Sequence, residues 1–349
     1  MKKFSNVFVL MLVVAMLLPA CGTSTDAAPD CRSTAIFCVG MVTNLGKLDD
    51  NSFNQSAWAG VEQARKNLGS IGEHIVTTDT KDYDKNISTF GESGYDVIVT
   101  VGFALGKATV KAASAYPNTK FIGVDQNQVQ DTDQPIPENL VRLVFAEDQA
   151  GFLVGALAAQ MSTSRKIGAV CSTDEVASIW RYCEGFRAGA AYIDPSVEVT
   201  VTYHTDITFD EAFFDPVWGA ATAKSMMDAG IDVIMGAGGE TGNGAISAAA
   251  KQDVYALGFD DDKYYSLPEV RKMLLSSAMK VITPGVFNLI KAAKDGQFPG
   301  GTNFVGTIDY APFHDQASNV PPDVKDTMKE IEKGLRDGSI LTNVEPEKP

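Results

Sequence analysis

The segment DVIMGAGGETGNGAISAAAKQDVYALGFD (residues 232–260) contains one complete unit of an alternating α/β fold. An apolar β-type run is followed by a glycine turn, an alanine-rich stretch with helical spacing and a second apolar run. The segment DVIVTVGFALGKATVKAASAYPNTKFIGVD (residues 96–125) repeats this order. Each copy ends in an aspartate, Asp260 or Asp125, directly after its second apolar run, and this internal similarity predicts two related lobes.

The same alternation extends over most of the chain, and it predicts an α/β fold with parallel sheets covered by helices on both faces. In such sheets ligands bind at the carboxyl ends of the strands. We therefore expect a cleft with Asp125 on one wall and Asp260 on the other. Strands are predicted over residues 37–43, 96–101, 120–125, 165–170, 197–203, 232–236 and 254–260.

The length and composition are those of a globular protein. The chain has 349 residues, of which 45% are hydrophobic and 21% charged, and at roughly 150 residues per domain this predicts about two domains. The formal net charge is −15. A surface this acidic repels phosphate backbones and anionic lipids, so the charge argues against a nucleic-acid partner and against a polybasic membrane contact. It leaves room for a small polar ligand.

The N-terminus predicts export. Two lysines precede an unbroken apolar run over residues 7–18, which is shorter than the roughly 20 residues of a spanning helix, so residues 1–20 are predicted to be a signal peptide. The closing LPAC (residues 18–21) resembles a bacterial lipobox, which would make Cys21 the lipidated first residue of the mature chain. An ordinary secretory signal with an unrelated cysteine is the alternative. Residues 21–35 are predicted to tether the domain to the lipid.

The other cysteines allow disulfides, because an exported protein meets an oxidising environment. Pairing between sequence neighbours needs the least rearrangement of the chain, while buried thiols and a zinc site are the alternatives. Zinc would require tighter spacing and nearby histidines, and the chain has only three widely separated histidines. The four cysteines are Cys31, Cys38, Cys171 and Cys183.

Catalytic motifs are missing from the sequence. It contains no G-x-S-x-G elbow, no H-E-x-x-H helix and no G-x-x-x-x-G-K-[ST] loop. The stretch GAGGET (residues 236–241) nearly fits the dinucleotide fingerprint G-x-G-x-x-G, so a dehydrogenase is the enzyme alternative. Thr241 replaces the third glycine, and an exported protein meets little nicotinamide cofactor. We expect no cofactor, no metal and no enzymatic activity.

A polar segment, LGKLDDNSFNQS (residues 45–56), lies between the first predicted strand and helix. Aspartate and serine at a helix start are ordinary caps for unpaired amide groups. Capping does not explain Phe53 in the first turn. A partly exposed aromatic ring at the mouth of a cleft is suited to stacking on a flat ligand, although the helical spacing is also compatible with a core position.

The motifs MVTN (residues 41–44) and DDNSFNQSAW (residues 49–58) closely resemble the opening of the basic membrane protein family. These proteins are bacterial substrate-binding lipoproteins of ABC transporters and include purine nucleoside receptors. The similarity covers nearly all of the mature chain in the same order. Further matching segments are residues 101–103, 121–125, 151–155, 238–244, 258–262 and 277–280.

The resemblance implies a type I periplasmic-binding fold, in which two doubly wound parallel-sheet lobes are joined by three hinge crossings. We place the crossings near residues 144–146, 281–284 and 307–312. The N-terminal lobe would then comprise residues 36–145 and 282–308, and the C-terminal lobe residues 146–281 and 309–349.

The resemblance also implies a nucleoside between the lobes. Phe53 and an aromatic residue of AFFDP (residues 212–216) would sandwich the base. Phe213 fits this role better by its offset from the following Asp-Pro, and Phe214 is the alternative. Aromatic rings suit the faces of a base, whereas amide and carboxylate groups suit the donors and acceptors at its edge.

The polar contacts follow from the same resemblance. Asn44 and Asp125 would read the base edge, Asn54 would also contact the ligand, and a second set would hold the ribose hydroxyls through charge-assisted hydrogen bonds. Asn44 stands where the family usually has aspartate, which changes the edge from acceptor-only to mixed. For the charged residues, a helix cap or a surface ion pair is the alternative. The ribose set is Gly239, Asp260 and Lys280.

These expectations describe a monomeric, lipid-anchored receptor on the extracytoplasmic face of the cell membrane that passes purine nucleosides to an ABC transporter permease. A receptor of the same fold for a sugar or a flavin is the main alternative. An enzyme or a structural surface protein is more remote.

Overall fold

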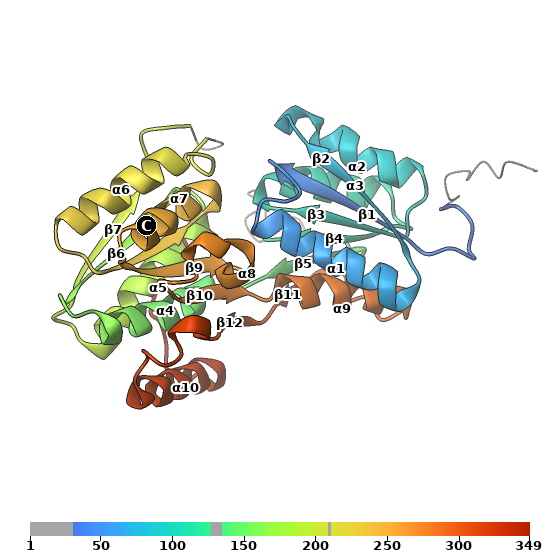
Figure 1. Cartoon of the computed structure of the whole chain (residues 1–349). Coiled ribbons are helices and arrows are strands. Elements are labelled where there is room, and N and C mark those ends of the chain that lie inside the picture. The colour runs from blue at the N-terminus through green and yellow to red at the C-terminus, as the bar shows by residue number, and fades with distance from the viewer. Residues whose placement is uncertain (1–30, 127–134, 209–210) are drawn as a thin grey trace, which may run out of the picture.

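The computed structural model describes residues 31–126, 135–208 and 211–349, which form two α/β lobes (Figure 1). The predicted signal peptide, Cys21 and the tether as far as residue 30 lie outside the described residues. Within the described part of the chain, no helix is both long and apolar enough to cross a membrane.

The N-lobe is built on a six-stranded parallel sheet with the order β11-β5-β4-β3-β1-β2. Helices α1 and α9 cover one face and α2 and α3 the other, each over its own apolar core. The elements of this lobe are β1 (Cys38–Leu45), α1 (Phe53–Leu68), β2 (Ile71–Thr77), α2 (Tyr83–Glu92), β3 (Val97–Val101), α3 (Gly106–Ala115), β4 (Lys120–Val124), β5 (Leu140–Val144), α9 (Ile282–Lys294) and β11 (Thr302–Val305).

The C-lobe repeats this plan with the order β12-β10-β9-β8-β6-β7, in which only β12 is antiparallel. Helices α4, α5 and α10 pack on one face, and α6 and α7 on the other. Its elements are α4 (Glu147–Met161), β6 (Lys166–Cys171), α5 (Ala177–Ile193), β7 (Glu198–Tyr203), α6 (Pro216–Asp228), β8 (Val233–Ala237), α7 (Gly239–Lys251), β9 (Tyr255–Asp260), α8 (Lys263–Ser266), β10 (Leu274–Lys280), β12 (Ile308–Tyr310) and α10 (Pro322–Asp337).

The chain passes between the lobes three times: from β5 to α4, from β10 to α9 and from β11 to β12. Two doubly wound lobes with three connections are the type I periplasmic-binding fold, so the predicted fold class is confirmed. Ile308, which the sequence assigned to the N-terminal lobe, pairs instead with Lys280 in the C-lobe sheet. The amide of Gly306 still donates to the carbonyl of Val144 at the end of β5. The chain therefore leaves the N-lobe sheet between residues 306 and 308.

Both lobes end their central strands in the same backbone geometry. Gly102 follows β3 and Gly238 follows β8, with φ of 99° and 94°, a left-handed region that favours glycine. Asp125 and Asp260 follow or end the next strands with φ of 57° and 61°. This shared geometry turns both aspartates toward the space between the lobes, and both line the same cleft.

Two disulfides are formed between sequence neighbours. Cys31 is bonded to Cys38, so the first described residue is tied to the start of β1. Cys171 at the end of β6 is bonded to Cys183 in α5. The second bond fixes α5 against the edge of the C-lobe sheet where the cleft lies.

Candidate functional site

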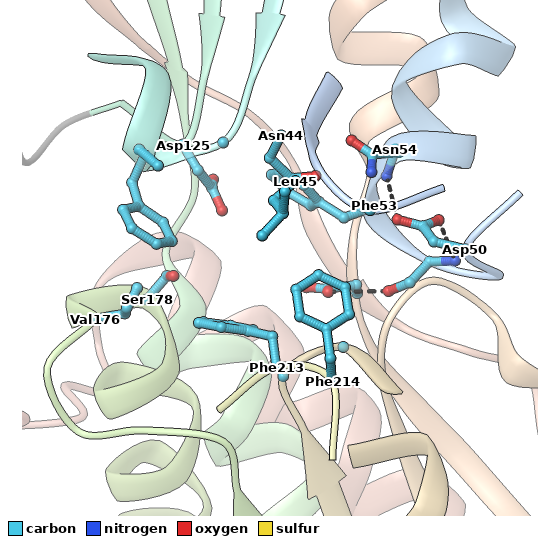
Figure 2. Close-up of a pocket in the computed structure, with 18 of the residues that line it drawn as sticks. Asn44, Leu45, Asp50, Phe53, Asn54, Asp125, Val176, Ser178, Phe213 and Phe214 are labelled. Atoms are coloured by element: carbon cyan, nitrogen blue, oxygen red, sulfur yellow. Dashed lines mark hydrogen bonds between the residues drawn. The ribbon is translucent and has the colours of Figure 1, made fainter. Parts of the chain in front are cut away.

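A cleft of about 980 Å³, including the part open to solvent, lies between the carboxyl edges of the two sheets (Figure 2). Asn44, Leu45 and Phe53 reach it from the N-lobe, and Phe213 and Phe214 face them from the C-lobe (Figure 2). All residues that the sequence assigned to the ligand site line this cleft: Asn44, Phe53, Asn54, Asp125, Phe213, Gly239, Asp260 and Lys280.

A buried lysine forms the centre of the cleft floor. The Lys280 ammonium is paired with the carboxylate of Asp125 from the opposite lobe, and it lies 3.2 Å from Glu147 Oε1 and 3.9 Å from Asp260 Oδ1. It also lies 5.4 Å from the centre of the Phe53 ring. The strand-end aspartates of both lobes therefore converge on one cation, an arrangement that joins the lobes directly.

The charges at this centre shift one another's proton affinities. Burial alone would lower the pKa of Lys280, but the surrounding carboxylates raise it above its ordinary value, so the ammonium stays charged. Burial raises the pKa of Asp125 to about 6, although Lys280 acts in the opposite direction. Burial likewise raises the pKa of Asp260.

Two charged residues of this centre were missed by the sequence reasoning. Glu147, in the first turn of α4, is fully buried, and its Oε2 accepts a 2.8 Å hydrogen bond from Arg181 Nε of α5. The sequence signal available for Glu147 was its position, because an acidic residue followed directly after a predicted hinge crossing. Arg181 carried no comparable signal within its helical pattern.

The start of α1 determines where Phe53 lies. Asp50 accepts hydrogen bonds from the backbone amides of Ser52 (2.9 Å), Asn54 (2.8 Å) and Gln55 (3.2 Å). The helix is therefore capped by Asp50 and not by Ser52, the residue directly before its first turn. Burial raises the pKa of Asp50 to about 6, against the lowering effect of these three amides. The capped turn holds Phe53, the first residue of α1, half-buried at the cleft.

Three buried oxygens in the cleft have no donor among the residues that the structure describes: Asn44 Oδ1, Asn54 Oδ1 and Asp125 Oδ1. The amide group of Asn54 is bound to the carbonyl of Lys47 at 3.0 Å, which fixes the orientation of that side chain. A buried acceptor left without a donor is costly, so this edge of the cleft favours a ligand with hydrogen-bond donors.

The aromatic wall of the C-lobe is held by the start of α7. Thr241 Oγ1 donates to the carbonyl of Ala212 at 2.7 Å and accepts from the amide of Asp215 at 2.9 Å. Gly239 has φ of 60°, and a Cβ there would lie 2.5 Å from the carbonyl oxygen of Phe213. The near-fingerprint of this segment therefore holds the loop that carries Phe213.

Phe213 and Phe214 differ in their surroundings. The Phe213 ring lies 6.2 Å, centre to centre, from the Phe103 ring of the N-lobe, so these two rings meet across the cleft. Phe214 is 41% exposed and approaches the backbone of Gly46. Phe103, which the sequence reasoning did not select, adds another aromatic ring to the cleft lining.

Two further contacts bridge the lobes beside the cleft. Ser52 Oγ donates to Asp260 Oδ2 at 3.2 Å, and the ammonium of the fully buried Lys263 donates to the carbonyl of Asn51 at 2.8 Å. Both join the segment just before α1 to the end of β9 or the segment that follows it. In the parts of the chain that the structure describes, no group of three or more His, Cys, Asp or Glu side chains could hold a metal ion.

Comparison with known proteins agrees with this architecture. The family model for PnrA-like substrate-binding proteins of ABC transporters matches residues 37–311. A CD4+ T-cell-stimulating antigen of Listeria innocua is 31% identical over the full length of both chains. The ABC transporter nucleoside-binding protein BmpA of Lactococcus lactis subsp. cremoris is 28% identical, with 97% of this chain and 98% of that protein covered.

Solved structures share the fold. An ABC transporter solute-binding protein from Aeropyrum pernix K1 has a TM-score of 0.75 at 23% identity, with 87% of this chain and 92% of that chain covered. A second solute-binding protein, from Conexibacter woesei, has a TM-score of 0.69 at 20% identity over 87% of this chain and 98% of that chain. At this identity the similarity concerns the fold alone.

Proposed function

Because the chain belongs to the PnrA-like family of ABC transporter substrate-binding proteins, we propose that it binds a purine nucleoside between its lobes and delivers it to a membrane permease. The family consists of binding proteins and not of enzymes, so the dehydrogenase alternative is set aside. The near-fingerprint at residues 236–241 has a structural role in holding the Phe213 loop.

The observation that carries the proposal is the combination of aromatic walls with a buried polar floor in one cleft. A nucleoside has flat apolar faces, a base edge with donors and acceptors, and vicinal hydroxyl groups. Phe53 and Phe213 would take the faces, and the unpartnered oxygens of Asn44 and Asp125 would accept from the base edge. Gly239, Asp260 and Lys280 would hold the ribose, with Asn54 beside them.

The charges of the cleft argue for a nucleoside without a phosphate. Lys280 already faces Asp125, Glu147 and Asp260, so its charge is fully compensated by carboxylates. A phosphate would add further negative charge beside these groups and would be repelled. Hydroxyl and amino groups, which donate, would be accepted.

We also propose that a lipid on Cys21 holds a monomeric receptor at the extracytoplasmic face of the membrane. The support is the lipobox-like sequence and the relatives named as basic membrane proteins, such as basic membrane protein B of Borreliella burgdorferi, which is 30% identical over 249 residues. The Cys21→Ser variant should move from the membrane fraction to the soluble fraction. Retention of that variant in the membrane fraction would contradict lipid anchoring.

Native mass spectrometry of the freshly purified protein, followed by calorimetry on ligand-stripped protein, tests the ligand. We expect a co-purified purine nucleoside and saturable binding of adenosine, guanosine or inosine, with much weaker binding of AMP. AMP binding as tightly as adenosine would contradict the charge argument. Binding of glucose, ribose or riboflavin in place of all nucleosides would replace the proposed ligand by another class.

A further inference from the structure

Glu147 connects the cleft floor to an arginine outside it. One carboxylate oxygen, Oε1, lies 3.2 Å from the Lys280 ammonium, and the other accepts from Arg181 Nε at 2.8 Å. Arg181 does not line the cleft, and Glu147 is almost completely buried between the two cations. Any movement of Arg181 therefore reaches Lys280 through a single shared carboxylate.

Arg181 is in turn held by the end of the chain. After α10, residues 339–349 return across the C-lobe; we call this segment the C-terminal strap. Its Pro346 carbonyl accepts from Arg181 Nη1 at 3.1 Å. On either side of this contact, Thr342 donates to Asp148 of α4, and Lys348 is paired with Asp174 at 2.5 Å. The strap is thus attached at three points to the segments that carry Glu147 and Arg181.

The balance of charge explains why Arg181 matters to the cleft. Lys280 faces three buried carboxylates, those of Asp125, Glu147 and Asp260, and its ammonium lies 5.3 Å from the centre of the Tyr182 ring. Arg181 and Lys280 share the charge of Glu147, so Lys280 can also pair with the two strand-end aspartates. Without the guanidinium, Glu147 would compete for the same ammonium, since attraction between buried charges is strong.

We propose that Arg181 is a positioning residue for ligand binding and that the C-terminal strap holds it in place. Arg181 fixes Glu147, and Glu147 then directs the Lys280 ammonium at Asp125 and Asp260. The inference rests on the proposed ligand function. It deepens that function by adding a residue outside the cleft lining that affects ligand affinity. It also lies outside the matched family segment in part, because the strap follows residue 311.

Three variants and one matched control test the inference. Arg181→Met removes the charge, Arg181→Lys keeps it without the fork of the guanidinium, and a chain ending at Asn343 removes the Pro346 carbonyl and Lys348. Arg187→Met is the control, because Arg187 lies on the same helix but pairs with Glu184 at the surface. Calorimetry with inosine, guanosine and adenosine gives the Kd of each variant.

We expect Arg181→Met to raise the Kd about tenfold, the effect of losing a charged hydrogen bond. The truncated chain should show a smaller rise of about threefold, since only one neutral acceptor is lost from Arg181. Arg181→Lys should recover part of the affinity, and Arg187→Met should bind like the wild type. The loss of affinity on acidification should begin at higher pH in Arg181→Met, because its three carboxylates share one cation fewer. If Arg181 had a purely structural role, the pH profile would not shift and lysine would not restore affinity.

A second readout needs no ligand. Acylation of Lys280 by an amine-directed, water-soluble reagent, followed by mass spectrometry, should be slower in Arg181→Met and in the truncated chain than in the wild type and in Arg187→Met, because only the deprotonated amine reacts and a less compensated Glu147 holds the proton on Lys280 more tightly. Wild-type affinity, an unshifted pH profile and unchanged Lys280 reactivity in Arg181→Met would overturn the inference. If that variant fails to fold, the same result in the truncated chain would do so. Absence of nucleoside binding by the wild type would instead refute the proposed ligand, and the acylation contrast would still decide the role of Arg181.

Discussion

The two lobes share one scaffold and differ in the residue beside the strand-end aspartate. In the C-lobe, Asp260 is aligned with Met279, and the next residue is Lys280. In the N-lobe, the register of β4 and β5 aligns Val124 with Leu143, which places Phe145 at the position corresponding to Lys280. Equivalent backbones thus present a carboxylate in both lobes but a cation in only one of them.

This difference makes the cleft depend on both lobes. The N-lobe contributes Asp125 as an acceptor, and only the C-lobe contributes the ammonium that neutralises it. Phe145 stays near this centre, with its ring centre 5.8 Å from the Lys280 ammonium, so the corresponding positions of the two lobes meet. The two similar lobes therefore divide donor and acceptor between them, and a ligand can use both only when the lobes are together.

Removing the cation should have the largest effect. In Lys280→Met three buried carboxylates lose their shared partner, so the free energy of unfolding should fall by about 3 kcal/mol. The Kd for nucleoside should rise about a hundredfold, which corresponds to a loss of about 2.8 kcal/mol of binding free energy at 1.4 kcal/mol for each tenfold change. Chemical denaturation and calorimetry measure the two effects.

The control is Lys291→Met, which removes an exposed lysine paired with Asp295 on α9. It should change neither quantity measurably, because exposed ion pairs contribute little. Wild-type affinity in Lys280→Met would show that the asymmetry between the lobes has no role in binding.

The aromatic residues of the cleft allow a second comparison of the two lobes. Phe53→Ala in the N-lobe and Phe213→Ala in the C-lobe should each weaken nucleoside binding by about 1–3 kcal/mol, the range for loss of a stacked base. Phe304→Ala, which removes an exposed ring on β11, is the control for aromatic loss away from the cleft. If Phe213→Ala is neutral and Phe214→Ala abolishes binding, Phe214 is the stacking residue. If all three cleft variants are neutral, the proposed stacking of the base between two aromatic rings is wrong.

The fold was predictable because its signals are local. Alternating apolar runs and glycine turns identify strands and helices within windows of a few residues, and the aspartates after two such strands mark the carboxyl edges of both sheets. Asp125 and Asp260 could be placed in one cleft from this pattern alone. The lobe boundary near Ile308 was less accurate, because a short edge strand has little pattern of its own.

The charged network was not predictable because its contacts span long stretches of sequence. Glu147 and Arg181 are 34 residues apart, and the contacts of Lys263 with Asn51 and of Ser52 with Asp260 join residues more than 200 positions apart. Each of these side chains has an ordinary local explanation as a cap or a surface charge. Their importance follows only from the packing of one lobe against the other.

The pH dependence of binding should distinguish the contribution of Asp125 from that of Asp260, the strand-end aspartate of the C-lobe. The pKa of Asp125 is raised to about 6 in the folded protein, so its carboxyl favours folding when protonated: that contribution is complete below about pH 4 and is lost as the pH rises through 6. In the proposed function, ligand binding would use the ionised oxygen and would have the opposite trend. The Kd should rise about tenfold for each pH unit below 6.

Calorimetry between pH 5 and 8, together with unfolding free energies of the wild type and Asp125→Asn, measures both trends. Asp125→Asn should bind more weakly at neutral pH but with a nearly flat profile, since its amide does not titrate. An equally steep profile in Asp125→Asn would assign the titration to another group, such as Asp50 or Asp260.

The smallest expected effect concerns the contact that joins the lobes without lining the cleft. Lys263 donates to the carbonyl of Asn51 at 2.8 Å and pairs with Asp261 of its own lobe at 2.5 Å. Lys263→Met removes one bond between the lobes, so nucleoside Kd should rise about fivefold, in line with roughly 1 kcal/mol for one hydrogen bond. Asp261→Asn keeps that bond and should bind like the wild type.

Small-angle scattering should show a smaller radius of gyration for the saturated wild type, and Lys263→Met should need more nucleoside to contract equally. Identical titrations for Lys263→Met and wild type would mean that closure depends on the ligand alone, whereas an unchanged radius in saturated wild type would refute closure itself.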